Sequence, residues 1–254
     1  DVADALVPKQ AQIEQSDQSL PQRPVPVGKE VRATLEGKDI AFARLSQRIT
    51  QREGAHIQHR VALTDGAEPL QNRMLALPSP FTLLLDIIHA VEYLWDAANA
   101  LLGETHPQRT DWVRERLLHI LSGQTQIVIQ ELENVMNDTS LSPAQRDTLQ
   151  TTIGYYRRNA PYMQYDQYLQ NGWPIGTGVV EGACGHLVKD RMEQSGMRWT
   201  KQGAQSLLDL RAVRINDDWD AYQRFHRRCQ HQRLYGACVV TLPTPEHWAL
   251  DQAA

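Results

Sequence analysis

The chain has 254 residues, of which 41% are hydrophobic and 22% charged, so it can bury one sizeable core or two small ones. No apolar run approaches the roughly 18 residues that cross a bilayer, which argues against a membrane protein. The formal net charge of −4 excludes a protein that coats DNA through bulk positive charge, because non-specific affinity comes from Lys and Arg at phosphates.

Positive charge is concentrated toward one end of the chain. Between His186 and Arg233 there are ten Lys and Arg residues and six acids. The three cysteines, Cys184, Cys229 and Cys238, form no CxxC pair, which favours a reducing cytoplasm over a disulfide framework. The chain begins DVADALVPKQ, without an initiating Met or the segments of a signal peptide, so we expect a fragment of a longer protein.

The first part of the chain predicts alternating strands and helices. Residues 1–28 are rich in Gln, Pro and Ser and indicate a linker, and a helical pattern follows from Asp39 to Gln51. HRVALTDG predicts a strand ending at Asp65, and residues 68–76 predict a helix. FTLLLDIIH predicts a buried strand because it is short, apolar and bounded by prolines, and HAVEYLWDAANALLG predicts an amphipathic helix that stops at Gly103. These elements indicate an α/β fold.

The rest of the chain is expected to be helical, so that the protein is mostly helical by content. Between residues 106 and 172 the pattern predicts helices at 110–122 and at 124–137. A third helix is expected to begin at an N-cap at Ser142, and a fourth to run from Tyr162 to Gln170 and to end at Gly172. Beyond this block, helices are expected through Glu181, from Thr200 to about Ile215, and from about Asp217 to Arg233.

Two carboxylates lie where neighbouring buried strands are expected to end. Open α/β sheets bind ligands at this edge, so Asp65 and Asp86 are candidate site residues, with His89 completing the pattern Asp-x-x-His. In the alternative interpretation Asp86 caps the next helix and His89 is a satisfied buried histidine. The spacing of these residues leaves both interpretations open.

Glu181 lies in a predicted helix that also contains Gly182 and Gly185. Each glycine costs about 1 kcal/mol in a helix interior relative to alanine, so a compensating interaction is expected. Close approach of this helix to the sheet would allow Glu181 to share a metal ion with a strand carboxylate. A tight helix crossing that leaves Glu181 exposed is the alternative.

Several residues after Glu181 are candidates for DNA contacts. Lys189 and Arg191 suit phosphate contacts, and Lys201 belongs to the same basic stretch. Arg198 and Trp199 suit the backbone and a base or sugar, although Trp199 could equally belong to a core.

Two further groups have simpler explanations than metal binding. The spacing of His226, Cys229 and His231 matches no standard zinc finger and favours a solvated basic helix. Three acids, Asp217, Asp218 and Asp220, open a predicted helix, where negative charge favours the helix dipole.

Five segments together resemble the bacterial Kra-type insertion-sequence transposases, which are related in layout to the Mutator-like group. The segments are TDGAEPLQ at 64–71, LDIIHAVEYLWDAA at 85–98, GTGVVEGACGHLVKDRMEQSGMRW at 176–199, GAQSLLDLRAVR at 203–214 and DDWDAYQRFHRR at 217–228. The resemblance covers roughly residues 27–233, and the segment around Glu181 is its most specific part.

The resemblance implies an RNase H-like core with an all-helical insertion before the helix that bears the glutamate. It divides the chain into a linker (1–28), the first part of the core (29–105), the insertion (106–172), the glutamate helix and the following helix (173–215), and a basic helix with a tail (216–254). By this resemblance Asp65 is the second acid of a DDE triad and Glu181 the third, and both are metal ligands. Asp86 and His89 match an accessory motif near the active site.

The first acid of the triad has no match in the chain under this assignment. Asp65 and Asp86 could instead be the first two acids, but too few residues separate them for the strands and helix that intervene in this fold. The first acid is then expected before residue 1, and the chain by itself is expected to be catalytically inactive.

The expected function is therefore that of a DNA transposase catalytic-core fragment. The family nicks transposon ends and transfers strands with two Mg²⁺ or Mn²⁺ ions, which take oxygen ligands and stabilise the attacking and leaving oxygens of an in-line displacement. The implied partner is DNA, at transposon ends and target, in a cytoplasmic, nucleoid-associated location, and pairing of two ends favours a homodimer. An inactive remnant that binds DNA or partner subunits is the alternative, and a purely structural helical protein leaves the Glu181 segment unexplained.

Overall fold

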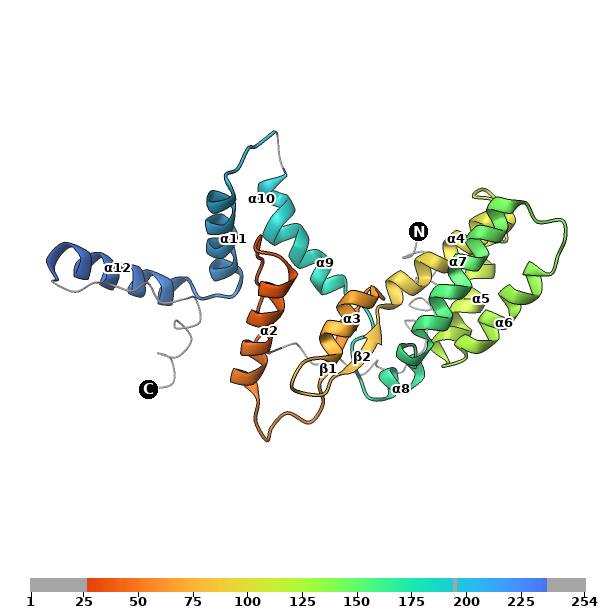
Figure 1. Ribbon diagram of the computed structural model, residues 1–254, viewed down its shortest axis with the longest axis horizontal. Coiled ribbons are helices and arrows are strands. Elements are labelled where there is room, and N and C mark those ends of the chain that lie inside the picture. Colours follow the sequence, from red (N-terminus) through yellow and green to blue (C-terminus); the bar gives the residue numbers. More distant parts are fainter. Residues whose placement is uncertain (1–26, 194–195, 237–254) are drawn as a thin grey trace, which may run out of the picture. The chain divides into compact units, whose positions relative to one another are not determined.

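A computed structural model of the protein describes residues 27–193 and 196–236 (Figure 1). The expected extension before residue 27, the tail after residue 236 and Cys238 lie outside the described residues. The described part is mostly helical with one small parallel sheet, which is consistent with the expected α/β fold. It divides into two compact units, with residues 46–179 in unit 1 and residues 27–45 and 180–236 in unit 2. Across these residues, no helix is long and apolar enough to cross a membrane.

Unit 1 begins with a strand–helix–strand segment. Strand β1 (Val61–Thr64) runs parallel to β2 (Thr82–Leu85), and α3 (Glu68–Leu75) connects them. The register pairs Val61 with Thr82 and Thr64 with Leu85. Helix α2 (Lys38–Arg52) precedes the sheet, and the boundary between the two units falls within it, after Leu45. The two expected strands and both helices are therefore confirmed, and the two strands end level with each other.

The second strand is shorter than the sequence pattern predicts. FTLLLDIIH was expected to be extended throughout, but Asp86 is the N-cap of α4 (Ile87–Leu102), so Ile87, Ile88 and His89 are helical. The Asp86 side chain accepts a hydrogen bond from the Ile88 amide, which satisfies one of the unpaired N–H groups at the start of the helix. Periodicity alone does not distinguish the end of a buried strand from the beginning of a buried helix.

The rest of unit 1 is a helical block built around α4 (Figure 1). Helix α4 packs against α5 (Arg109–Leu121) and α7 (Pro143–Asn159), and α6 (Thr125–Met136) packs against both of those helices. Helix α7 begins with the expected N-cap at Ser142, reinforced by a reciprocal hydrogen-bond pair with Gln145. The 3₁₀ turn η1 (Ala160–Tyr162) and α8 (Tyr165–Gln170) end the block.

The core of unit 1 joins the strands to this block. Leu84, Leu85, Val91 and Leu94 belong to one buried cluster that continues through α5, α6 and α7. Tyr156 is fully buried in it and donates a hydrogen bond of 2.6 Å to the carbonyl of Ala90. The end of β2 and the start of α4 therefore lie in the buried core of unit 1.

Unit 2 contains most of α9 (Gly178–Cys184), which begins two residues before the boundary at residue 180, and the helices that follow it. Helix α9 continues into the π-helix η2 (Gly185–Lys189) and α10 (Asp190–Met192), and α11 (Lys201–Ile215) and α12 (Trp219–Tyr235) follow. The guanidinium of Arg211 on α11 donates to the carbonyls of His186 and Leu187, which η2 leaves available. A small core of Leu187, Leu208 and Ala212 lies behind this contact.

A short extended segment is tied to α11 by side-chain amides. Asn216 accepts from the Val31 amide at 2.8 Å and donates to its carbonyl at 3.1 Å. Gln205 accepts from the Leu35 amide at 2.8 Å and donates to the Ala33 carbonyl at 3.1 Å. These four hydrogen bonds resemble strand pairing and fix residues 31–35 on the helix.

Candidate functional site

Asp65 lies directly after β1, at the carboxyl end of the sheet. Its side chain is exposed, and one carboxylate oxygen accepts a hydrogen bond of 2.9 Å from the Ala67 amide. The other oxygen has no hydrogen-bond partner among the described residues. Asp65 can therefore present its second carboxylate oxygen to a ligand while the first keeps its hydrogen bond to the Ala67 amide.

Two side chains of α7 donate hydrogen bonds to backbone carbonyls just after the end of β1. Tyr155 donates a hydrogen bond of 2.9 Å to the Asp65 carbonyl, and Arg158 donates one of 3.0 Å to the Gly66 carbonyl. Tyr155 also stacks on Tyr93 with 3.8 Å between ring centroids. Burial, together with nearby negative charge, raises the pKa of the Tyr155 hydroxyl, so this group remains a donor.

Asp86 follows β2 and is fully buried. One carboxylate oxygen accepts from the amides of Ile88 at 3.1 Å and Thr177 at 3.2 Å, and the other accepts from the Thr177 hydroxyl. A buried carboxylate is stable only when it is paired or hydrogen-bonded in this way. Asp86 therefore joins the start of α4 to the segment that leads into α9, and the capping interpretation describes its contacts.

His89 lies on the first turn of α4, between two acids. Its Nδ1 is 2.9 Å from a Glu92 oxygen, and its Nε2 is 3.9 Å from a carboxylate oxygen of Asp86. Burial lowers the pKa of His89, but the hydrogen bond and charge of Glu92 and the charges of Asp86 and Asp65 outweigh it, so the pKa is raised. The side chain is 33% exposed, which differs from the buried histidine of the alternative interpretation.

Glu181 lies in α9, as expected, but its side chain is outside the described part of the structure. Asp65 belongs to unit 1 and Glu181 to unit 2, so the proximity of their carboxylates stays a prediction. A Cβ built at Gly182 or Gly185 would meet no described atom of unit 2 within 4 Å. Within that unit, no close approach explains these two glycines.

Metal-ligand geometry is incomplete in the described residues. They contain no group of three or more His, Cys, Asp or Glu side chains arranged to hold an ion, and this includes His226, Cys229 and His231 on α12. Asp65 suits a hard cation because it presents a free oxygen, whereas both oxygens of Asp86 are already engaged. A metal site here requires a further ligand, for which Glu181 is the sequence-based candidate.

The five candidate DNA-contacting residues are all exposed and all belong to unit 2. Lys189 and Arg191 lie at the end of η2 and in α10, while Arg198, Trp199 and Lys201 lie in and just after the connection to α11. Trp199 is 39% exposed, so it is not a core residue of the described structure. An exposed indole beside cations is suited to contact a base or sugar.

Helix α12 is basic, with four arginines and one aspartate between Trp219 and Tyr235, and contains no buried residue. Asp220 lies in its first turn, where a negative charge was expected. Asp218 occupies the N-cap position without a side-chain cap hydrogen bond, and Asp217 adopts a positive φ of 64°.

Sequence reasoning missed several residues that position this site. Tyr155, Arg158 and Thr177 reach Asp65, Gly66 and Asp86 from more than 85 residues away. An isolated Tyr or Arg in a helical block carries no local pattern that marks such a contact. Thr177 lies in the segment that resembles the transposases, which was the only available signal.

No protein family, no curated protein and no solved structure matches the chain.

Proposed function

We propose that the chain is the catalytic-core fragment of a DNA transposase, which nicks transposon ends and transfers strands with Mg²⁺ or Mn²⁺. The observation that carries the proposal is the edge of the parallel sheet, where exposed Asp65 and buried Asp86 follow register partners on adjacent strands. The order of strands, helical block and α9 also agrees with the layout that the sequence resemblance implies. An RNase H-like core belongs to the same proposal.

Chain connectivity supports a role for Glu181 at this edge. The amide of Thr177 donates to Asp86, and Glu181 follows Thr177 by only four residues. A four-residue span reaches at most about 14 Å, which limits the distance from Thr177 to the Glu181 backbone. Asp65 and Glu181 would then hold the metal ions.

Each side chain at the edge then has a distinct role. The bound ions would stabilise the attacking and leaving oxygens at phosphorus. Asp65 supplies a ligand oxygen, Tyr155 and Arg158 fix the backbone that presents it, and Asp86 fixes the beginning of the segment that leads to Glu181. The pKa of His89 is raised, and at pH values below it the side chain is a positively charged imidazolium beside the acids. This charge can attract a phosphate.

DNA binding by unit 2 is tested by replacing Lys189 and Arg191 with alanine. We expect weaker binding to duplex DNA and a flatter dependence of log K on log salt, by about 0.9 for each lost phosphate contact. Fluorescence anisotropy between 50 and 200 mM salt measures both quantities.

The control removes the same charge from unit 1, by replacing Arg114 and Arg157 on α5 and α7 with alanine. Its salt dependence should remain that of the unmodified chain. Equal effects of the two double variants, or no effect of the first, would show that Lys189 and Arg191 do not contact DNA.

A second candidate function is DNA or subunit binding without catalysis. It is favoured because both oxygens of Asp86 already accept hydrogen bonds. Of the two carboxylates at this edge, Asp65 is then the one with an oxygen that has no partner among the described residues. The two functions differ in metal binding, because a non-catalytic remnant needs DNA affinity but no divalent cation.

A further inference from the structure

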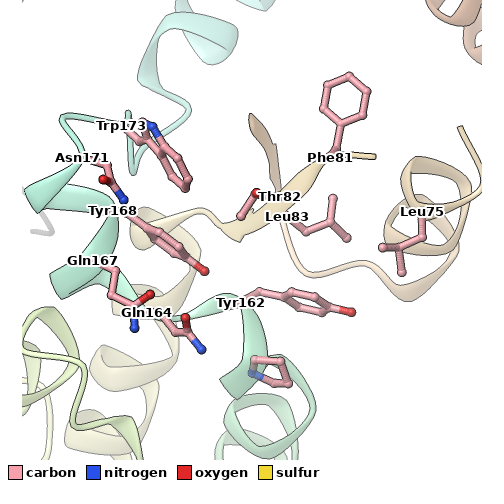
Figure 2. A pocket seen from close by; sticks show the side chains of 11 residues that line it. Leu75, Phe81, Thr82, Leu83, Tyr162, Gln164, Gln167, Tyr168, Asn171 and Trp173 are labelled. Carbon is pink, nitrogen blue, oxygen red and sulfur yellow. The ribbon is translucent and has the colours of Figure 1, made fainter. Parts of the chain in front are cut away.

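A pocket opens at the other end of the sheet from the two carboxylates (Figure 2). Its volume is about 290 Å³, and it is lined by the beginning of β2 and by the segment from Pro161 to Trp173. Figure 2 shows Trp173 and Tyr168 on one side and Leu83 and Phe81 on the other. All of these residues belong to unit 1.

The chemistry of this pocket is neutral, aromatic and amide-rich. Among the described residues no Lys, Arg, His, Asp or Glu lines it, although the ring of His59 lies 5.3 Å from that of Trp173. Trp173 and Tyr168 stack with 6.0 Å between their centroids. A charged ligand would lose hydration without gaining a counter-charge here. The pocket therefore favours an uncharged ligand with a flat ring.

Three primary amides supply hydrogen-bonding groups at the pocket. Gln164, Gln167 and Asn171 lie along α8 and its two ends, and their side-chain amides have no partner among the described residues. A primary amide offers a donor and an acceptor side by side, which matches the edge of a nucleobase and adenine in particular. Aromatic rings stack on any base.

We propose that this pocket binds one unpaired nucleobase of a DNA strand. The inference rests on the proposed DNA function for its biological ligand, but the pocket chemistry is independent of that function. Thr82 at the pocket and Asp86, which directly follows β2, are four residues apart along extended backbone, or about 13 Å. A single DNA strand is long enough to span the separation between the pocket and the edge where Asp65 is exposed.

The test compares two 12-nucleotide oligomers with the same backbone charge, one of deoxyadenosine and one entirely abasic. The unmodified chain should bind the base-containing oligomer roughly tenfold more tightly at fixed salt, because stacking and amide contacts are lost without bases. Replacing Gln164 and Gln167 with alanine, or Trp173 with leucine, should reduce this ratio toward one.

The matched control replaces the exposed Gln126 and Gln130 of α6 with alanine and should keep the ratio unchanged. A base preference that arises at exposed Trp199 instead would survive in all the pocket variants, and that result overturns the proposal. Equal binding of both oligomers by the unmodified chain overturns it too, while leaving DNA binding intact.

Failure of the proposed function is recognised separately, by titrating deoxyadenosine itself. If neither oligomer binds, the DNA function is refuted. Saturable shifts of amide resonances confined to residues 161–173 and 81–83 would still show that the pocket binds a nucleoside. No such shifts at millimolar deoxyadenosine would refute the pocket.

Discussion

Replacing Gly66 with alanine is expected to destabilise unit 1 by about 3 kcal/mol. Gly66 has a φ of +82°, a conformation that costs an L-residue about 1–2 kcal/mol. An added Cβ would also lie 2.7 Å from the Tyr155 hydroxyl and 2.9 Å from a methyl group of Leu85. Overpacking of this kind costs about 1–3 kcal/mol.

The surrounding side chains cannot easily give way to this methyl group. Tyr155 is held by its stacking on Tyr93 and by its hydrogen bond to Asp65, and Leu85 is fully buried. Hydrogen exchange of the amides in α4 and α7 measures the loss. Because Gly66 adjoins Asp65, the same variant should also displace the candidate ligand.

Gly172 provides the control for backbone conformation alone. It has a φ of +68°, and no described atom lies within 4 Å of an added Cβ. Its replacement by alanine should cost only about 1 kcal/mol. Equal losses for the two variants would mean that Tyr155 and Leu85 do not confine the backbone after Asp65.

Replacing Asp86 with alanine should also cost about 3 kcal/mol. Loss of the N-cap of α4 contributes about 0.5–2 kcal/mol, and a buried donor left without an acceptor contributes about 1–3 kcal/mol. The donors that lose their acceptor are the Ile88 amide and the amide and hydroxyl of Thr177. The same exchange measurement on α4 records the effect.

Two milder variants separate the cap from the Thr177 contacts. Asn at position 86 retains one acceptor oxygen and should lose about 1 kcal/mol. Valine in place of Thr177 removes only its hydroxyl and should lose a similar amount. If Asp86→Ala proved no worse than Thr177→Val, the carboxylate would not be the joint between α4 and the segment leading into α9.

Local patterns in the sequence predicted most of the secondary structure. The Ser142–Pro143 pair marks the start of α7, and short apolar runs mark both strands, because these signals depend on neighbouring residues. The end of β2 was placed too late, since Ile87 and Ile88 are as apolar as the strand before them. Here the cap at Asp86, rather than hydrophobicity, determines where the helix begins.

The candidate site was predictable only in part. The positions of Asp65 and Asp86 follow from a general rule for strand ends, and their matched register agrees with it. Asp65 is exposed and Asp86 is buried. This difference arises from the contact between Asp86 and Thr177, which are 91 residues apart in the sequence. Long-range contacts of this kind leave no local pattern, and the same holds for Tyr155 and Arg158 beneath Asp65.

We propose that Asp65 and Glu181 share a divalent cation. Anomalous diffraction from crystals of the chain grown with Mn²⁺ tests it directly, with Asp65→Asn as the control. We expect a Mn²⁺ peak about 2.1 Å from carboxylate oxygens of both residues, which disappears in the control. The proposal is contradicted if no peak lies beside Asp65 at saturating Mn²⁺, or if Asp65 holds an ion that Glu181 does not touch.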